Sequence, residues 1–162
     1  MKKCWIILLL AVLLSGCAAE TFETVNDEIL QPVMAPVGKF NLDLPDSAAE
    51  AVMQNEEGGK LYLCEDYVLT VQTLTAGDMD RTVRSLCGFD SDHVSVMETS
   101  AGGVQRYDWV WTAIGEGGDQ IGRAAVLDDG NYHYCVTVMA DAETAGELEK
   151  EWNKMFASLT LD

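Results

Sequence analysis

The sequence has few basic residues, few histidines and no apolar run long enough to cross a membrane. It contains 10 Lys and Arg against 27 Asp and Glu, so its formal net charge is −17 at pH 7. Such an acidic surface repels phosphate backbones, which argues against nucleic acid as a partner. The apolar run from Trp5 to Leu14 is shorter than the roughly 20 residues that a transmembrane helix needs.

The sequence also lacks the motifs of common enzyme and metal sites. It has no Cys-x-x-Cys pair for redox chemistry or zinc, no Gly-x-Ser-x-Gly and no His-Glu-x-x-His. The segment Gly115–Gly118 is rich in glycine but lacks the lysine of a phosphate-binding loop. We therefore expect no catalytic residues, no metal and no cofactor.

The first 17 residues determine where the rest of the chain acts. Lys2 and Lys3 precede the apolar run, and small residues follow it, as in a secretory signal peptide. The segment Leu14-Ser15-Gly16-Cys17 resembles the bacterial lipobox. That resemblance implies cleavage after residue 16 and a diacylglyceryl thioether on Cys17, which would become the mature N-terminus.

Removal of residues 1–16 would leave 146 residues, the size of one domain. Lys2 and Lys3 would be lost, so 8 basic residues would remain against 27 acidic ones, a formal charge of −19. We interpret the acidic segment 17–37 as a flexible tether and residues 38–162 as a single domain. Anionic lipids would repel this domain, so only the lipid on Cys17 would hold it to the membrane.

Three cysteines remain in the predicted domain, Cys64, Cys87 and Cys135. An odd number outside the cytoplasm allows one disulfide and one free thiol, or three buried reduced thiols. The sequence does not decide between these states.

Alternating apolar and polar residues, separated by turn residues, predict an antiparallel sheet of about six to seven strands. The segment Asp128–Asn131 contains Asp-Gly chemistry typical of a tight hairpin turn. We expect strands over residues 40–44, 60–64, 67–74, 94–99, 104–114, 121–127 and 132–139.

Three helices are predicted around these strands. A short one begins at Ser47, a second lies between Asp78 as N-cap and Gly88 as C-terminal residue, and a third follows Thr144. Thr144 and Glu147 have the spacing of a capping box. The terminal helix is strongly amphipathic, and we expect it to cover the strand face that carries Tyr107, Trp109 and Trp111.

This α+β order of elements resembles the PsbP/Mog1-like α/β/α sandwich of small bacterial lipoproteins. The resemblance covers residues 38–162 and depends on Phe40 to Pro45, Tyr132 to Met139 and Trp152 to Ser158. It implies a protein that binds other proteins or stabilises assemblies. It brings no catalytic residues with it.

Two groups of residues suggest alternative functions. Asp90-Ser91-Asp92 and Asp128–Asn131 could favour a cation-stabilised domain, but Ser95 and Ala101 stand where a helix-loop-helix calcium motif needs glycine and glutamate. His133 and Cys135 share one strand face and could form a thiol–imidazole pair, although no third orienting group is evident.

Arg106 and Asp108 share a strand face that Arg123 on the neighbouring strand could join. They would form either a structural cross-strand ion cluster or a binding surface on an open side of the sheet. From the whole sequence we expect a membrane-anchored, extracytoplasmic, non-catalytic binding or assembly module with a protein partner in the cell envelope. A thiol- or histidine-dependent enzyme around His133 and Cys135 is the alternative.

Overall fold

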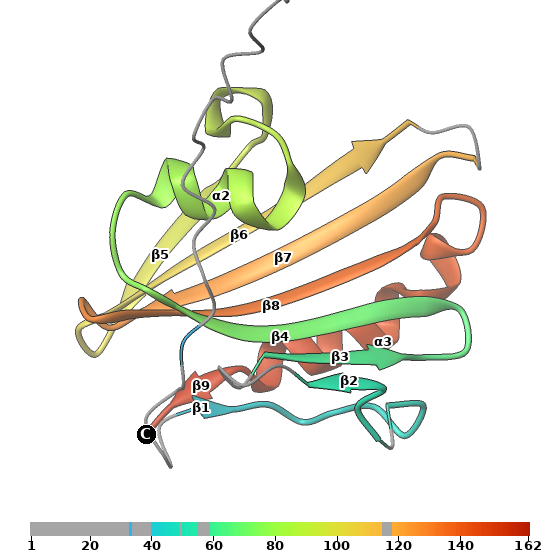
Figure 1. Cartoon of the computed structure of the whole chain (residues 1–162), viewed down its shortest axis with the longest axis horizontal. Coiled ribbons are helices and arrows are strands. Elements are labelled where there is room, and N and C mark those ends of the chain that lie inside the picture. The colour runs from blue at the N-terminus through green and yellow to red at the C-terminus, as the bar shows by residue number, and fades with distance from the viewer. Residues whose placement is uncertain (1–32, 34–39, 49, 55–58, 115–117) are drawn as a thin grey trace, which may run out of the picture.

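The computed structural model describes residues 33, 40–48, 50–54, 59–114 and 118–162. A seven-stranded antiparallel sheet forms its centre, with the order β2-β3-β4-β8-β7-β6-β5 (Figure 1). Its strands are β2 (Met53–Gln54), β3 (Lys60–Leu63), β4 (Tyr67–Thr75), β5 (Met97–Ala101), β6 (Val104–Ala113), β7 (Gln120–Asp128) and β8 (Tyr132–Asp141). The predicted α+β class, with an antiparallel sheet and packed helices, is confirmed.

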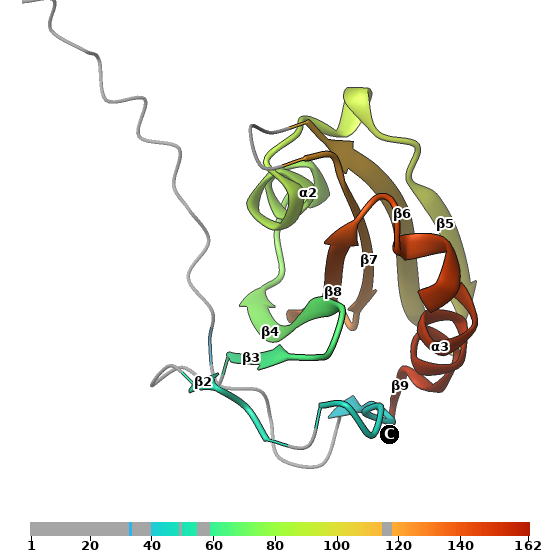
Figure 2. The same cartoon turned by 90° about the vertical axis from the view of Figure 1, so that its right-hand side faces the viewer.

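The two α-helices of the described residues lie on opposite faces of this sheet (Figure 2). Helix α2 (Met79–Cys87) covers one face, and α3 (Ala145–Ser158) covers the other. A short 3-10 helix, η1 (Ser91–His93), follows α2, and β1 (Phe40–Asn41) pairs with β9 (Thr160–Leu161) in a separate two-stranded sheet beside α3. None of the helices described is long and apolar enough to span a bilayer.

The central strand β8 is buried on both faces, which explains its position in the middle of the sheet. Tyr134, Val136 and Val138 belong to the core under α3, whereas Cys135 belongs to the core under α2. All four side chains are fully buried. Alternate residues of a strand point to opposite faces, so one apolar strand can support a helix on each side.

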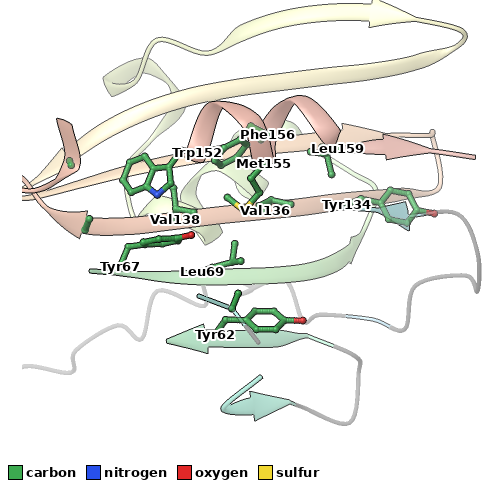
Figure 3. Close-up of a cluster of buried hydrophobic side chains, with 14 of the residues drawn as sticks. Tyr62, Tyr67, Leu69, Tyr134, Val136, Val138, Trp152, Met155, Phe156 and Leu159 are labelled. Atoms are coloured by element: carbon green, nitrogen blue, oxygen red, sulfur yellow. The ribbon is translucent and has the colours of Figure 1, made fainter. Parts of the chain in front are cut away.

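The larger core lies between α3 and the sheet (Figure 3). Trp152, Met155 and Phe156 of α3 point toward Val136 and Val138 of β8, and each is at most 4% exposed. Met155 and Phe156 follow Trp152 by three and four residues, so all three side chains lie on one side of the helix. Burial of each side chain contributes about 1.5–3 kcal/mol, so this helix is a main source of stability.

The smaller core lies under α2 and corrects the expected position of the aromatic strand face. Trp109 and Trp111 of β6 pack with Val83 of α2 and Leu74 of β4, not with the terminal helix. The prediction that the terminal helix covers these tryptophans was wrong. Both helices are amphipathic, and the alternation within β6 does not specify which of them covers which face.

The ends of α2 agree with the prediction, whereas the start of α3 does not. Asp78 accepts a hydrogen bond from the backbone N of Asp80 at 3.1 Å, and Gly88 ends the helix with φ of 77°. Thr144 makes no side-chain capping bond, because its hydroxyl donates instead to the carbonyl oxygen of Asp141 at 3.2 Å. The predicted capping box is therefore wrong.

The chain before β3 also differs from the prediction. Ala48 N donates to Pro45 O at 2.9 Å and closes a turn, and Met53–Gln54 pairs with β3 as a strand. The helix predicted from Ser47 is wrong, because backbone pairing with β3 replaces it. The strand predicted over 40–44 covers only Phe40–Asn41, and the one predicted over 94–99 begins at Met97 instead.

Candidate functional site

Cys17, the predicted lipid-attachment residue, lies outside the described residues, as does the predicted signal peptide 1–16. Of the predicted tether 17–37, the structure describes only Val33, whose backbone N donates to Thr73 O at 2.6 Å. The lipid anchor therefore stays a prediction.

A groove of about 590 Å³ lies between the segment Asp43–Asp46 and the outer side of α3. We call it the α3 groove. Its volume is in the range of known small-molecule sites, about 300–1,000 Å³. Its lining combines apolar side chains with charges of both signs: Asp43, Leu44, Pro45, Asp46, Glu147, Lys150, Glu151, Lys154 and Met155.

Hydrogen bonds hold the two walls of the α3 groove together. The backbone N of Asp43 donates to Ser158 Oγ at 2.9 Å, and the Ser158 hydroxyl donates to Met155 O at 2.7 Å. The turn from Pro45 to Ala48 closes the other end of the segment. The segment is thus tied to the last turn of α3.

A buried phenol stands behind the α3 groove. Tyr67 of β4 is 5% exposed, packs edge-on against Trp152 at 5.8 Å, and donates its hydroxyl to Glu151 Oε1 at 2.5 Å. Burial raises the pKa of Tyr67, and the bond to Glu151 raises it further. The phenol therefore stays protonated, and it occupies one oxygen of a carboxylate that lines the groove.

Arg106, Asp108 and Arg123 come together on the sheet face that α3 covers. Arg106 forms two bonds to the Asp108 carboxylate, of 2.7 and 3.0 Å, and a third to Phe156 O at 3.0 Å. Arg123 donates to Asn153 Oδ1 at 2.6 Å, and its guanidinium carbon lies 4.4 Å from the centre of the Phe156 ring.

These contacts connect β6 and β7 to α3, and they use most of the donors of Arg106. Burial lowers the pKa of Arg123, while the negative charge of Asp108 raises it in part. The arrangement supports the structural interpretation of the cluster more than an open binding surface. A binding role for these three residues stays a prediction.

His133 lies in a polar cluster that the sequence only partly indicated. A hydrogen bond of 2.7 Å joins its Nδ1 to the hydroxyl of Thr82 on α2, and Asp128 Oδ2 lies 3.5 Å from its Nε2. Asp128 is thus a candidate for the orienting group that the sequence did not reveal. His133 and Thr82 are both fully buried, however, so substrate cannot reach this cluster in the described conformation.

Cys135 is a poor nucleophile in this environment. Its thiol is fully buried, and its Sγ donates to His133 O at 3.4 Å rather than to the imidazole. Burial raises the pKa of the Cys135 thiol, which disfavours the reactive thiolate. Cys64, Cys87 and Cys135 are all free thiols in the structure.

The two acidic segments considered for calcium are used in other ways. The carboxylates of Asp128 and Asp129 accept backbone N–H bonds within the hairpin turn, where Gly130 has φ of 86°. Asp90 pairs with Arg84. Ligand atoms of Asp90, Asp92 and His93 lie within 4.8 Å of one another, but all three side chains are exposed, so proximity alone indicates no metal site.

No window of the sequence pointed to the α3 groove, because its walls are separated by about 100 residues. The sequence feature that came closest to indicating the groove is the pair Lys150 and Lys154. They are four residues apart and so share one side of the terminal helix.

No protein-family model matches the sequence, and no curated protein is similar enough in sequence to indicate a relationship. A solved structure is similar in fold: "LpqN involved in cell envelope biogenesis of Mycobacterium tuberculosis". The two share 15% sequence identity with a TM-score of 0.50, over 81% of this chain and 89% of that one. At this identity the likeness shows a common fold.

Proposed function

We propose that the chain is a non-catalytic binding or assembly module of the cell envelope, anchored through a lipid on Cys17 at the extracytoplasmic face of the membrane. The binding part of this proposal depends on the α3 groove, which is open, has walls joined by a hydrogen bond and is lined by charges of both signs. LpqN, which has a similar fold, is involved in cell envelope biogenesis, and this favours the same setting for our protein.

The absence of catalysis is also part of the proposal. Among the described residues, the polar cluster closest to a catalytic arrangement is that of Thr82, His133 and Asp128. Thr82 and His133 are fully buried, and a nucleophile must reach its substrate. The described lining of the α3 groove includes no serine, cysteine or histidine, and we assign its lysines and carboxylates to binding.

The anchor can be tested by replacement of the predicted lipidated cysteine. Cys17→Ser should move the protein from the membrane fraction to the soluble fraction or block its processing, because the acyl chains supply the attachment at about 0.8 kcal/mol per buried methylene. Cys64→Ser is the matched control and should stay with the membrane. Intact mass spectrometry should show the lipid on the wild-type protein, and an N-terminus at Met1 would contradict the proposal.

The binding role can be tested with the soluble domain, residues 38–162, immobilised and exposed to solubilised envelope. Envelope components that the wild-type domain retains should be lost from the double variant Lys150→Glu/Lys154→Glu, which inverts the cations of the groove. Lys60→Glu changes the same type of residue on β3, outside the groove lining, and should retain them. Equal retention by all three proteins would show that the groove is not the binding site.

A further inference from the structure

We propose that the α3 groove binds short zwitterionic peptides. The cations Lys150 and Lys154 would take the peptide carboxylate, and Asp43 and Asp46 on the facing segment would take its ammonium group. An apolar side chain would lie against Leu44 and Pro45 between them. This inference depends on the binding role proposed above, but not on the lipid anchor.

Among the described basic residues, the lysines without an ion pair are concentrated at the α3 groove. Arg84 pairs with Asp90, Arg106 pairs with Asp108, and Arg123 donates to Asn153. No ion pair involves Lys60, Lys150 or Lys154 within the part of the chain that the structure describes. Two of these three lysines line a single groove, although the chain has only 10 basic residues in total.

The segment that faces α3 across the groove carries carboxylates. Asp43 and Asp46 are exposed and lie on the segment opposite α3. Helix α3 presents Lys150 and Lys154 together with Glu147 and Glu151, so only the facing segment carries charge of a single sign. Neither Asp43 nor Asp46 forms an ion pair with a described residue. One oxygen of Glu151, by contrast, already accepts the Tyr67 hydroxyl, so its capacity for a ligand is reduced.

The charge pattern limits the class of ligand. The lining holds four carboxylates and two ammonium groups, so a polyanion such as a phosphate chain would be repelled by the groove as a whole. A purely cationic ligand would be attracted to the carboxylates but would leave Lys150 and Lys154 without a counter-charge. A neutral apolar ligand would leave both sets of charges without partners. A ligand with one ammonium and one carboxylate group satisfies both walls at once.

The apolar part of the lining indicates what lies between the two charges. Leu44 is 40% exposed, and Pro45 and the buried Met155 border the same groove. A peptide side chain placed there would remove Leu44 from water at about 25 cal/mol per Å² of apolar area. A tripeptide with a central leucine and free termini has the required groups.

The test is an NMR titration of the soluble domain with three matched probes. These are Ala-Leu-Ala with both termini free, the same peptide with an acetylated N-terminus, and the same peptide with an amidated C-terminus. The free peptide should bind most tightly, and loss of either terminal charge should weaken binding about fivefold, the upper range for a partly exposed ion pair. Amide shifts should concentrate in residues 43–46 and 147–155.

The variants should assign each charge to its wall. Lys150→Gln/Lys154→Gln should weaken the free peptide to the level of the amidated one and have little effect on the amidated probe. Asp43→Asn/Asp46→Asn should weaken binding of the free peptide to the level of the acetylated one. It should have little effect on the acetylated probe. Lys60→Gln and Asp92→Asn, outside the groove lining, should bind like the wild type.

Equal affinity for all three probes, or no shifts at 10 mM peptide, would overturn the zwitterionic assignment. Those outcomes are distinguishable from failure of the proposed function. If envelope components are retained and lost on inversion of Lys150 and Lys154, but the peptides do not bind, then the groove is a binding site for another class of ligand. If neither the envelope components nor the peptides bind, both proposals fail.

Discussion

A close approach between a strand glycine and a core side chain gives a sharp test of the fold. Gly122 of β7 lies opposite Trp111 of β6, and a Cβ added there would be 2.7 Å from Cη2 of the indole and closer still to Cε2 and Cζ2. Ordinary contacts begin at about 3.5 Å. Because Trp111 is only 5% exposed, its ring cannot move aside without disturbing the core under α2.

Gly122→Ala should therefore destabilise the domain. Overpacking costs about 3 kcal/mol at the upper end of its usual range, and alanine recovers about 0.5–1 kcal/mol because it loses less backbone entropy than glycine in a strand. The net loss is about 2 kcal/mol, or a fall in Tm of roughly 8 °C for a domain of this size. Urea unfolding followed by tryptophan fluorescence measures the free energy directly.

Two further variants make the Gly122 result decisive. Gly146→Ala lies in α3 with nothing near the added Cβ, so it should be neutral or stabilising by up to about 1 kcal/mol. In a Trp111→Leu background the bulky ring is absent, so Gly122→Ala should lower the free energy of unfolding much less than it does in the wild type. If Gly122→Ala is as stable as the wild type, the packing of Trp111 on this glycine is wrong.

Three other predictions concern the buried cluster under α2. Thr82→Val should cost about 1–3 kcal/mol in urea unfolding, because it leaves His133 Nδ1 without a partner, whereas Thr82→Ser should cost less. Burial lowers the pKa of His133 despite Asp128, so the unfolded chain binds the extra proton below about pH 6.5. Stability should therefore fall as the pH drops through that value, and an identical pH dependence in His133→Gln would contradict this. In the folded protein, Cys135 should resist iodoacetamide while the half-buried Cys64 and Cys87 react, and peptide mass spectrometry would show which thiols are labelled. Rapid labelling of Cys135 would support the enzyme alternative.

The elements that local chemistry determines were predictable from the sequence. The turn at Asp128–Asn131, the cap at Asp78 and the αL residue Gly88 all depend on residues within a few positions of one another. The alternation of β8 also predicted that His133 and Cys135 share one face, and both lie under α2. Such features need no knowledge of the remainder of the chain.

Long-range choices were not predictable in the same way. The tryptophan face of β6 could have been covered by either helix, and only the whole topology places α2 there. Met53–Gln54 became a strand because an edge of β3 was available, and this overrode a helical pattern after Ser47. The α3 groove was missed for a related reason, since β1–β9 pairing brings Asp43 to Ser158 from the other end of the domain.

Under the proposed function, helix α3 contributes to stability with one side and to binding with the other. Its inner side carries Trp152 and Phe156 in the core, and its outer side carries Lys150 and Lys154 in the groove, as a helical period of 3.6 residues requires. Because the inner side is fixed by packing, the outer side is held in place and a ligand pays little for ordering it. Exposed lysines can be changed at a cost usually within about 0.5 kcal/mol, so a loss of binding in those variants reports on the groove rather than on the fold.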